Sequence, residues 1–207
     1  MNWEKLIQEN RPLVIMGTIN AYSALLAERA GIKAIYLSGG GVANASYGLP
    51  DLAMTSREDV LEDVRRIRSA SELPLLVDID TGWGSALAIS RSIKEMISAG
   101  ASGVHIEDQV SEKRCGHRPN KEIVSSEEMV DRIKAAKDAQ TDDNFLLMAR
   151  TDAFAKGGLQ EVIDRSNAFI EAGAGAIFPE AITSLKDYDE ISKMYPSPYW
   201  LILLSLV

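Results

Sequence analysis

Short apolar runs alternate along the chain with longer segments in which apolar residues recur every three or four positions. The runs begin at Val14, Ala34, Pro74, Gly103, Phe145 and Ala176, and read VIMGTI, AIYLSG, PLLVDID, GVHIED, FLLMARTD and AIFPEA. The segments with helical spacing cover residues 21–30, 56–70, 85–99, 126–140, 159–172 and 184–194. Strands and helices that alternate in this way predict βαβ units and a parallel sheet.

Several of the predicted helix boundaries carry sequence signals of their own. Three helical segments end in Ala-Gly, and a glycine just past a helix end accepts the left-handed backbone that closes the helix. These glycines are Gly31, Gly100 and Gly173. Two segments begin with the spacing of a capping box, Thr55…Glu58 and Ser125…Glu128, which predicts helix starts there.

The residues that end the apolar runs distinguish a barrel from an open doubly wound sheet. Polar groups follow five consecutive runs, namely Ser38, then Asp78 and Asp80, then Glu107, then Arg150 and Asp152, then Glu180. Functional groups of an open sheet gather at one switch point, whereas barrel active sites are assembled at the carboxyl ends of many strands. The pattern therefore favours an α/β fold of the (β/α)8 TIM-barrel type, with the open sheet as the alternative.

The length of the chain limits how much of such a barrel we expect. It has 207 residues, whereas a complete eight-unit barrel typically needs about 250. No Pro/Ser-rich or low-complexity segment divides the sequence. We therefore expect a single domain over residues 1–207, a C-terminally truncated barrel of about six to seven βα units with an atypical apolar tail at residues 197–207.

Composition excludes several classes of partner. The net charge is −8, and Lys and Arg are not concentrated on one face, so nucleic acid and anionic membranes are poor candidates. The longest apolar run, YWLILLSLV, is too short to span a bilayer. The single cysteine cannot form an internal disulfide, and the charged N-terminal stretch lacks the apolar centre of a signal peptide. These features predict a cytoplasmic protein.

Three acids at neighbouring strand ends are candidate metal ligands. Asp78 and Asp80 are two residues apart on a strand, so their side chains point to the same face. Two close carboxylates repel each other unless a cation or a proton lies between them, and hard oxygen ligands suit Mg²⁺. Glu107, at the end of the next strand, would join through water. The alternative is that these acids cap helices or pair with arginine.

A polar connection of about sixteen residues follows the fourth strand and contains Lys113-Arg114-Cys115-Gly116-His117-Arg118. Loops of this length are usually functional or disordered. The surrounding basic groups would lower the pKa of the Cys115 thiol and make it a candidate proton donor or base, with Lys113 and His117 beside it. The alternative is a solvated basic loop with an incidental cysteine.

The remaining candidates would bind an anionic substrate. Ser38, Gly39 and Gly40, with Gly41, form a turn whose N–H groups could cradle a carboxylate, or a tight turn without a ligand. Gly116 offers a further N–H that an anion can approach. Arg150 could grip a carboxylate with two hydrogen bonds, or form a structural salt bridge with Asp152. Tyr36 shares the face of Ser38, with a core-filling role as the default, and His105 is interpreted as a wall residue of the barrel.

Taken together, these stretches resemble the isocitrate lyase/phosphoenolpyruvate mutase superfamily. The matching segments are YLSGGGVANASYGLPD, DIDTGWG, HIEDQVSEKRCGHRP, ARTDAFAKGGL and IFPEA, in the order of the family, and they span most of the chain from Val14 to Pro196. KRCGH is the most specific, since it is typical of the lyases and is replaced in phosphonopyruvate-type mutases and hydrolases. Phe178 and the compact chain resemble the branch that cleaves 2-methylisocitrate.

The resemblance implies a role for each candidate. Asp78 and Asp80 would hold Mg²⁺, with Mn²⁺ as the alternative ion, and Glu107 would join through water. The substrate, a small tricarboxylate, would be bound by Ser38, Gly39, Gly40, Asp51, Cys115, Gly116, Arg150 and Glu180. Cys115, on a mobile gate loop, would protonate the succinate carbanion left when pyruvate departs. Lys113, His117 and Tyr36 would assist, with Tyr36 a candidate first base by position only. Family members also form homotetramers.

The resemblance stops after Pro196, where the family continues with a seventh strand, an eighth unit and terminal helices. The sequence here reads SPYWLILLSLV, and we hypothesise an improvised seventh strand from Tyr199 to Val207. An apolar strand at an unclosed edge is prone to aggregation. Two functional alternatives stay open: a lyase for a related acid such as isocitrate or dimethylmalate, and a truncated inactive copy.

Overall fold

The computed structural model describes residues 2–116 and 118–194. Its elements, in chain order, are α1 (Trp3–Glu9), β1 (Ile15–Gly17), α2 (Ala21–Arg29), β2 (Ala34–Leu37), α3 (Gly39–Gly41), a π-helical segment (Val42–Ser46), α4 (Arg57–Ala70), β3 (Leu75–Asp78), α5 (Ala86–Ser98), β4 (Gly103–Glu107), α6 (Ser126–Asp138), β5 (Leu146–Thr151), α7 (Phe154–Glu171), β6 (Ala176–Pro179) and α8 (Leu185–Met194). All six predicted strands and the six predicted helices are present. The hypothesised strand from Tyr199 to Val207 lies outside the described residues.

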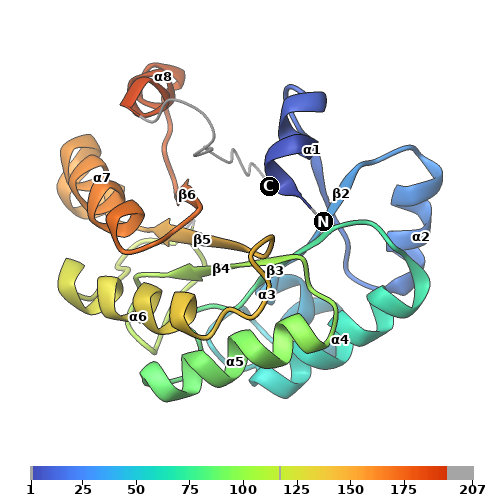
Figure 1. Cartoon of the computed structure of the whole chain (residues 1–207). Coiled ribbons are helices and arrows are strands. Elements are labelled where there is room, and N and C mark those ends of the chain that lie inside the picture. The colour runs from blue at the N-terminus through green and yellow to red at the C-terminus, as the bar shows by residue number, and fades with distance from the viewer. Residues whose placement is uncertain (1, 117, 195–207) are drawn as a thin grey trace.

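The six strands form one parallel sheet in the order of the sequence, from β1 to β6. A doubly wound sheet reverses its strand order at a switch point, so the open-sheet alternative is wrong. Figure 1 shows the strands curving around a common axis, with α2 and α4 to α7 on the outside. Within the described residues the architecture is a partial TIM barrel, as predicted.

Alternate strand residues face the helices or the interior of the partial barrel. The helix-facing residues belong to the larger core and include Ile35, Leu37, Val77, Val104 and Ile106, each fully buried. The interior-facing residues form a second cluster, made of Trp3, Ala34, Tyr36, Leu76, Met148, Ala176 and Phe178. This alternation places every second strand residue in the interior, where the polar strand ends also point.

The helix boundaries confirm most of the sequence signals and correct one. Gly31, Gly100 and Gly173 have φ values of 81°, 93° and 110°, as expected of glycines that close helices. The capping box of α4 is formed by Ser56 and Asp59, one residue later than predicted, because Ser56 N donates to the Asp59 carboxylate at 2.7 Å.

The second predicted box is half formed. Ser125 caps α6 by accepting from Glu128 N, but the Glu128 carboxylate pairs with Arg132 one turn further on. Glu128 therefore stabilises the exposed face of the helix rather than its first turn.

Three helical features were not predicted. Helix α1 has only seven residues and is held by tertiary contacts, since Trp3 is buried and its Nε1 donates to Ser102 O at 2.8 Å. The triple glycine is the short helix α3, which continues into the π-helical segment Val42–Ser46. Helix α7 begins at Phe154 and continues across a kink at Gly158, whose φ is 68°. No helix of the described residues is long and apolar enough to cross a membrane.

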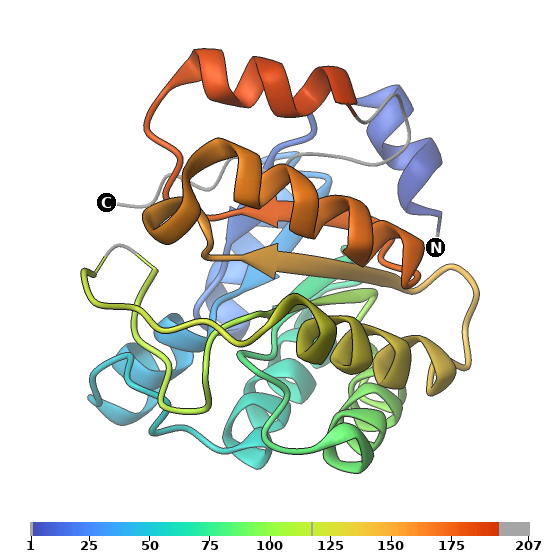
Figure 2. The ribbon, with the colours of Figure 1, turned by 90° about the vertical axis from the view of Figure 1, so that its left-hand side faces the viewer.

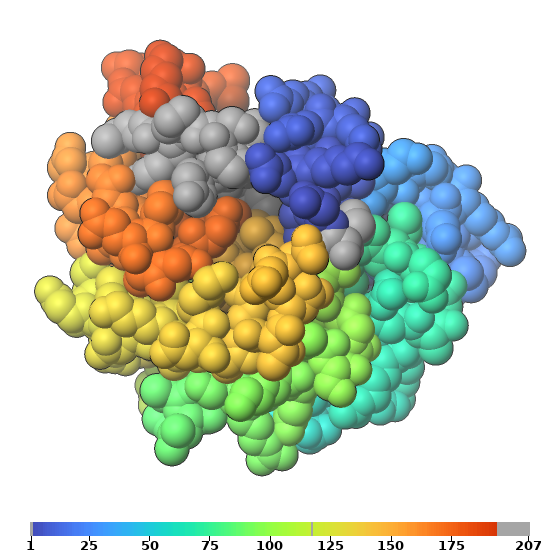
Figure 3. Space-filling view, viewed as in Figure 1, coloured from blue at the N-terminus to red at the C-terminus, as the bar shows by residue number. Residues whose placement is uncertain are grey.

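A cavity of about 770 Å³ opens beside α1 at the amino ends of the strands. Its lining includes Trp3, Leu13, Ile15, Phe145 and Met148. In the space-filling view α1, coloured dark blue, lies on the face turned to the viewer (Figure 3). Active sites of barrels lie at the carboxyl ends of the strands, so this cavity at the amino ends is not the candidate active site.

Candidate active site at the carboxyl ends of the strands

The sheet register brings interior side chains of neighbouring strands together. Asp78 of β3 is paired with His105 of β4, and Glu107 of β4 is paired with Arg150 of β5. In Figure 2 the carboxyl ends of β5 and β6 point to the same side as the connection between β4 and α6. The polar residues at the carboxyl ends of β3, β4, β5 and β6 therefore lie on the side of the sheet where this connection runs.

Tyr36, His105 and Asp78 form a buried hydrogen-bonded group. The Tyr36 hydroxyl lies 2.9 Å from His105 Nε2 and donates to Asp78 Oδ2 at 3.4 Å. Burial lowers the pKa of His105 to about 4, so its imidazole is neutral at pH 7. Burial and the charge of Asp78 raise the pKa of Tyr36, which therefore keeps its proton in this arrangement. His105 also meets Phe178 edge-on, as expected of a wall residue.

The Asp78 and Asp80 carboxylates lie close together, but the prediction that both are on a strand is wrong, because β3 ends at Asp78 and Asp80 follows it with a φ of 47°. The pKa values of the two acids are shifted in opposite directions. Burial opposes the ionised form of Asp78, but His105, which is protonated at the low pH where Asp78 titrates, together with Lys113 and Arg150 outweighs it and lowers its pKa to about 2. Burial and the neighbouring Asp78 raise the pKa of Asp80 to about 6. A β-carbon added to Gly39 would lie 3.0 Å from Asp80 Oδ1 and 3.2 Å from Asp78 Oδ2, so both carboxylates reach the same glycine.

Lys113 supplies the positive charge next to this pair. Its side chain is 4% exposed, and its Nζ lies 2.7 Å from Asp80 Oδ1 and forms an ion pair with Asp51. Although burial would lower the pKa of Lys113, the surrounding carboxylates raise it above its ordinary value. The predicted residues Lys113, Asp51 and Asp80 are thus brought into direct contact.

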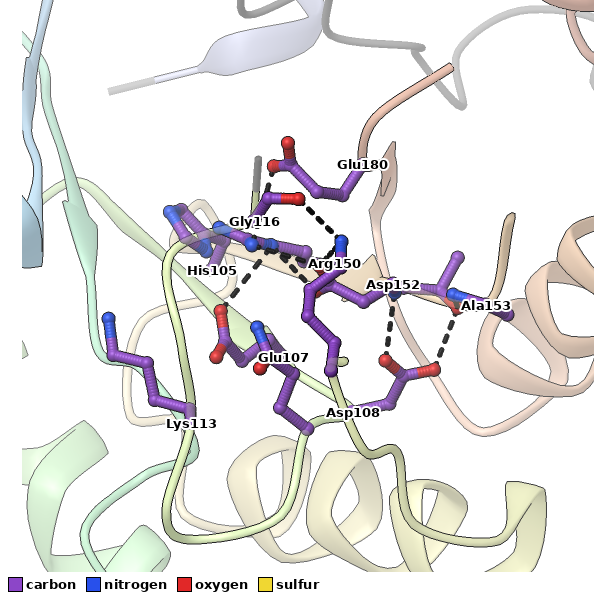
Figure 4. A network of polar contacts seen from close by, with 12 residues as sticks. His105, Glu107, Asp108, Lys113, Gly116, Arg150, Asp152, Ala153 and Glu180 are labelled. Atoms are coloured by element: carbon purple, nitrogen blue, oxygen red, sulfur yellow. Dashed lines mark hydrogen bonds and ion pairs between the residues drawn. The ribbon is translucent and has the colours of Figure 1, made fainter. Parts of the chain in front are cut away.

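Arg150 lies at the centre of a second group of acids (Figure 4). Its Nε is 3.0 Å from Asp152 Oδ2 and 3.3 Å from Glu107 Oε2, and its Nη2 is 3.4 Å from Glu180 Oε2. The structural salt bridge considered for Arg150 is therefore present, shared among three carboxylates. Burial raises the pKa of Glu107 well above its ordinary value.

The donor set of these acids fits a hard divalent cation. Both carboxylate oxygens of Glu107 are buried and make no hydrogen bond, and Asp78 and Asp80 present further oxygens close by. A cation stabilises the ionised form of buried carboxylates, and here it would add to the ion pair that Arg150 makes with Glu107 Oε2. As they are arranged in the described part of the chain, no three Asp, Glu, His or Cys side chains converge closely enough to form a complete ligand set. Any ion would therefore need oxygens from water or substrate as well.

The loop after β4 brings Cys115 and Gly116 to the same place. A β-carbon on Gly116 would lie within 3.0 Å of both Arg150 Nη2 and Glu180 Cδ, so this glycine packs directly on the Arg150 group. Cys115 is partly exposed beside it. The predicted site residue His117 lies outside the described residues.

One expectation about the glycine turn needs correction. We expected the N–H groups of Ser38 to Gly41 to be open to a ligand carboxylate, but Gly39 is buried and its N–H donates to Asp78 Oδ2 at 3.0 Å. The Gly41 N–H donates to Ser38 Oγ at 3.3 Å, because Ser38 is the N-cap of α3. In this structure the Gly39 N–H is bound to Asp78, and the Gly41 N–H is bound to the N-cap of α3.

Sequence reasoning missed Lys121. Its Nζ donates to Gly116 O at 2.6 Å and to Asp152 Oδ1 at 2.5 Å, and its side chain is 4% exposed. It lies in the polar connection after the fourth strand, where we considered only residues 113–118 as candidates. A single sequence holds no periodic signal for a contact that depends on how the loop folds back.

The whole arrangement corresponds to a known family. The chain matches the phosphoenolpyruvate phosphomutase family over residues 3–205. Since this match covers nearly the full length, the chain belongs to that family, within the phosphoenolpyruvate mutase/isocitrate lyase superfamily.

Two bacterial relatives are described as 2-methylisocitrate lyases. The protein of Shewanella oneidensis is 60% identical over 198 residues, which cover 96% of this chain and 68% of the relative. The protein of Escherichia coli is 60% identical over 194 residues, covering 93% of this chain and 65% of the relative. The chain thus spans about two thirds of the length of these relatives.

Solved structures of the superfamily have the same fold. Oxaloacetate acetylhydrolase in complex with 3,3-difluorooxalacetate has a TM-score of 0.89 at 32% identity, over 96% of this chain and 68% of that one. 2,3-Dimethylmalate lyase has a TM-score of 0.85 at 30% identity, over 92% and 65%. Phosphonopyruvate hydrolase, in complex with oxalate and Mg²⁺, has a TM-score of 0.77 at 34% identity, over 90% and 65%.

Proposed function

We propose that this chain carries the active site of a Mg²⁺-dependent carbon–carbon lyase that cleaves 2-methylisocitrate to pyruvate and succinate. The observation that carries the proposal is the packing of Gly116 against Arg150 and Glu180, which brings the KRCGH loop over the acidic strand ends. The 60% identity to relatives described as 2-methylisocitrate lyases supports this substrate.

The acidic strand ends would hold the metal ion. Asp80 and Asp78 would supply carboxylate oxygens, and Glu107 would act through water, since its two buried oxygens make no hydrogen bond. A bound Mg²⁺ stabilises negative charge on substrate oxygens. The structure of phosphonopyruvate hydrolase with oxalate and Mg²⁺ supports this choice of ion.

The chain's own residues would bind the tricarboxylate and move its protons. Arg150 offers a guanidinium to a substrate carboxylate, and Ser38, Gly40 and the Cys115–Gly116 backbone offer further donors. A base removes the proton of the substrate hydroxyl, and the electrons of the breaking C–C bond pass to the succinate carbon. The Cys115 thiol then delivers its proton to that carbon, which leaves pyruvate and succinate.

The remaining predicted residues would support these steps. Lys113, which is paired with Asp51 and Asp80, and His117 would stabilise the Cys115 thiolate after proton transfer. Glu180 would orient Arg150, which lies 3.4 Å from it. Tyr36 is a candidate base only if its raised pKa falls in the complex, since burial and Asp78 hold its proton here.

The test is to purify the chain and to measure pyruvate released from 2-methylisocitrate with Mg²⁺, with glyoxylate released from isocitrate measured in parallel. We expect pyruvate formation that EDTA abolishes and that is weak or absent with isocitrate. Cys115→Ser should bind the substrate but not turn it over. A folded chain that binds 2-methylisocitrate and releases no pyruvate would refute the proposed activity for this chain.

A second substrate class has structural support of its own. The fold is similar to those of oxaloacetate acetylhydrolase and 2,3-dimethylmalate lyase, whose names state smaller dicarboxylate substrates. Both acids belong in the same assay. Turnover of either, without turnover of 2-methylisocitrate, would replace the proposed substrate. Light scattering of the same sample would test the homotetramer that the resemblance implies.

A further inference from the structure

The loop that carries Cys115 is held by lysine–aspartate pairs on both sides of the cysteine. On one side Lys113 contacts Asp51 and Asp80. On the other side Lys121 contacts Asp152, which follows β5. Both lysine side chains are 4% exposed, so neither is a solvated surface charge.

The two pairs differ in what else they touch. Asp80, the partner of Lys113, belongs to the acidic group assigned above to the metal, so a bound cation would compete with Lys113 for it. Asp152, the partner of Lys121, is instead fixed by the protein on two sides. Arg150 Nε donates to Asp152 Oδ2 at 3.0 Å, and the backbone N–H of Asp152 donates to Asp108 Oδ1 at 2.9 Å.

Asp108 is itself held rigidly. Its Oδ2 accepts from Thr151 Oγ1 at 2.7 Å and from Arg165 Nη1 at 3.1 Å. Asp108, Thr151 and Arg165 are all buried and lie on β4, β5 and α7 or directly after them. Lys121 is therefore attached to an aspartate whose position is set by three packed elements.

Lys121 links this fixed aspartate to the backbone of the loop. Its Nζ donates to Gly116 O at 2.6 Å, while it contacts Asp152 Oδ1 at 2.5 Å. Gly116 in turn has no space for a side chain between Arg150 and Glu180. The ammonium therefore holds the peptide next to Cys115 in the one place where it packs on the Arg150 group.

We propose that Lys121 is a positioning residue, which fixes the Cys115–Gly116 backbone at the mouth of the partial barrel by tying the Gly116 carbonyl to Asp152. Its consequence for turnover rests on the proposed function, since it acts through the cysteine assigned there as proton donor. The structural part of the inference, namely that Lys121 restrains the backbone beside Cys115, stands without it.

The single cysteine of the chain allows a local test. The rate at which Cys115 reacts with a thiol reagent such as DTNB would be measured in the parent chain, Lys121→Met and Lys121→Arg. Lys134→Met, which removes an exposed lysine of α6, is the matched control. Far-UV circular dichroism would establish that each variant is folded.

We expect Lys121→Met to change the reaction rate of Cys115 by about tenfold, because a charged hydrogen bond to the adjacent peptide is lost. Lys121→Arg should restore part of the difference, and Lys134→Met should match the parent. Equal rates for folded Lys121→Met and the parent chain would overturn the inference. If Lys121→Met does not fold, Asp152→Asn, which removes the fixed charge, takes its place with the same two outcomes.

Turnover separates this inference from the proposed function. In an active chain, Lys121→Met should lower kcat for 2-methylisocitrate more than it raises KM, because substrate binding by Arg150 is retained while the proton donor is displaced. A changed thiol rate in a chain without lyase activity would support the positioning role and refute the activity alone. An unchanged thiol rate in an active chain would refute the positioning role and leave the proposed activity standing.

Discussion

Gly116 lies against Arg150 so closely that a β-carbon on the glycine would come within 3.0 Å of Arg150 Nη2. Real β-carbons essentially never make such contacts, and the second obstacle, the carboxyl carbon of Glu180, is just as near. The glycine of the KRCGH motif is thus explained by packing, since its φ is not in the left-handed region. Its role is to let the loop backbone reach the guanidinium.

Replacing this glycine should disturb the site more than the fold. We expect Gly116→Ala to lower kcat/KM for 2-methylisocitrate at least tenfold, because the loop or Arg150 must move (about 1.4 kcal/mol of lost transition-state binding). The matched control is Gly175→Ala, where a β-carbon would make only an ordinary contact of 3.4 Å with Leu146. Equal kinetics of the two variants would show that the close packing of Gly116 is not needed.

The raised pKa of Asp80 predicts an unusual dependence of stability on pH. Burial and Asp78 raise this pKa to about 6, above the ordinary value of 3.8, so the folded chain binds more protons than the unfolded chain between these values. The contribution of Asp80 to stability is therefore present below pH 4 and is lost as the pH rises through 6. In EDTA at pH 7, Asp80→Asn should unfold at a higher denaturant concentration than the parent chain.

The expected gain is about 2–3 kcal/mol at pH 7, and it should shrink towards zero near pH 4. Urea unfolding of both chains at the two pH values measures it. An Asn variant that is less stable than the parent at pH 7 would mean that Lys113 already compensates the Asp80 charge fully.

Lys113 should be required for stability when no divalent cation is added. Lys113→Met leaves Asp51 and Asp80 without their ammonium partner, and breaking a buried ion pair typically costs about 3–5 kcal/mol. Because Asp51 is partly exposed, we expect the lower end of this range. Urea unfolding in EDTA gives the number, with Lys134→Met as control. If millimolar Mg²⁺ restores part of the loss, the two cations compete for the same carboxylates; a loss below about 1 kcal/mol would argue that the pair is not effectively buried.

Phe178 should influence which acids fit the site. It is buried in the interior, meets His105 edge-on and lies 5.4 Å from the Arg150 guanidinium. We expect Phe178→Trp to reduce kcat/KM for 2-methylisocitrate about tenfold or more relative to isocitrate, since a pocket discriminates one methyl group by roughly that factor. Phe178→Leu should not produce this preference. Equal losses for both acids would place the substrate methyl group elsewhere.

The partial barrel was predictable because its signals are local and repeated. Strands buried on both faces are continuous apolar runs, and the two-residue period explains why Tyr36, Asp78 and Arg150 share the interior. Helix α1 was missed because its seven residues owe their helical state to the burial of Trp3, which is a tertiary effect. The helix predicted at residues 159–172 starts just after Gly158, where α7 has its kink, but α7 also extends before the kink to Phe154.

The candidate site was predictable to the extent that it lies at strand ends. The contacts of Asp78 and Glu107 follow from register, which a parallel sheet imposes. Asp80 lies beyond the end of β3 with a φ of 47°, so its position depends on the turn that follows the strand. The contacts of Lys113 and Lys121 depend on how a long loop folds over those ends, and no periodicity encodes that path. This is why Asp51 meets Lys113 across 62 positions of sequence, while Lys121 had no visible partner before the structure.

The consecutive strand order has a consequence for how the protein is made. Each strand from β2 to β6 pairs with the strand that precedes it in the sequence, so every new βα unit finds its partner already in place as the chain leaves the ribosome. Tyr36, Asp78, His105, Glu107 and Arg150 all precede the end of β5 at Thr151. The contacts among these five residues can therefore form during synthesis, and Glu180 joins them when β6 is added.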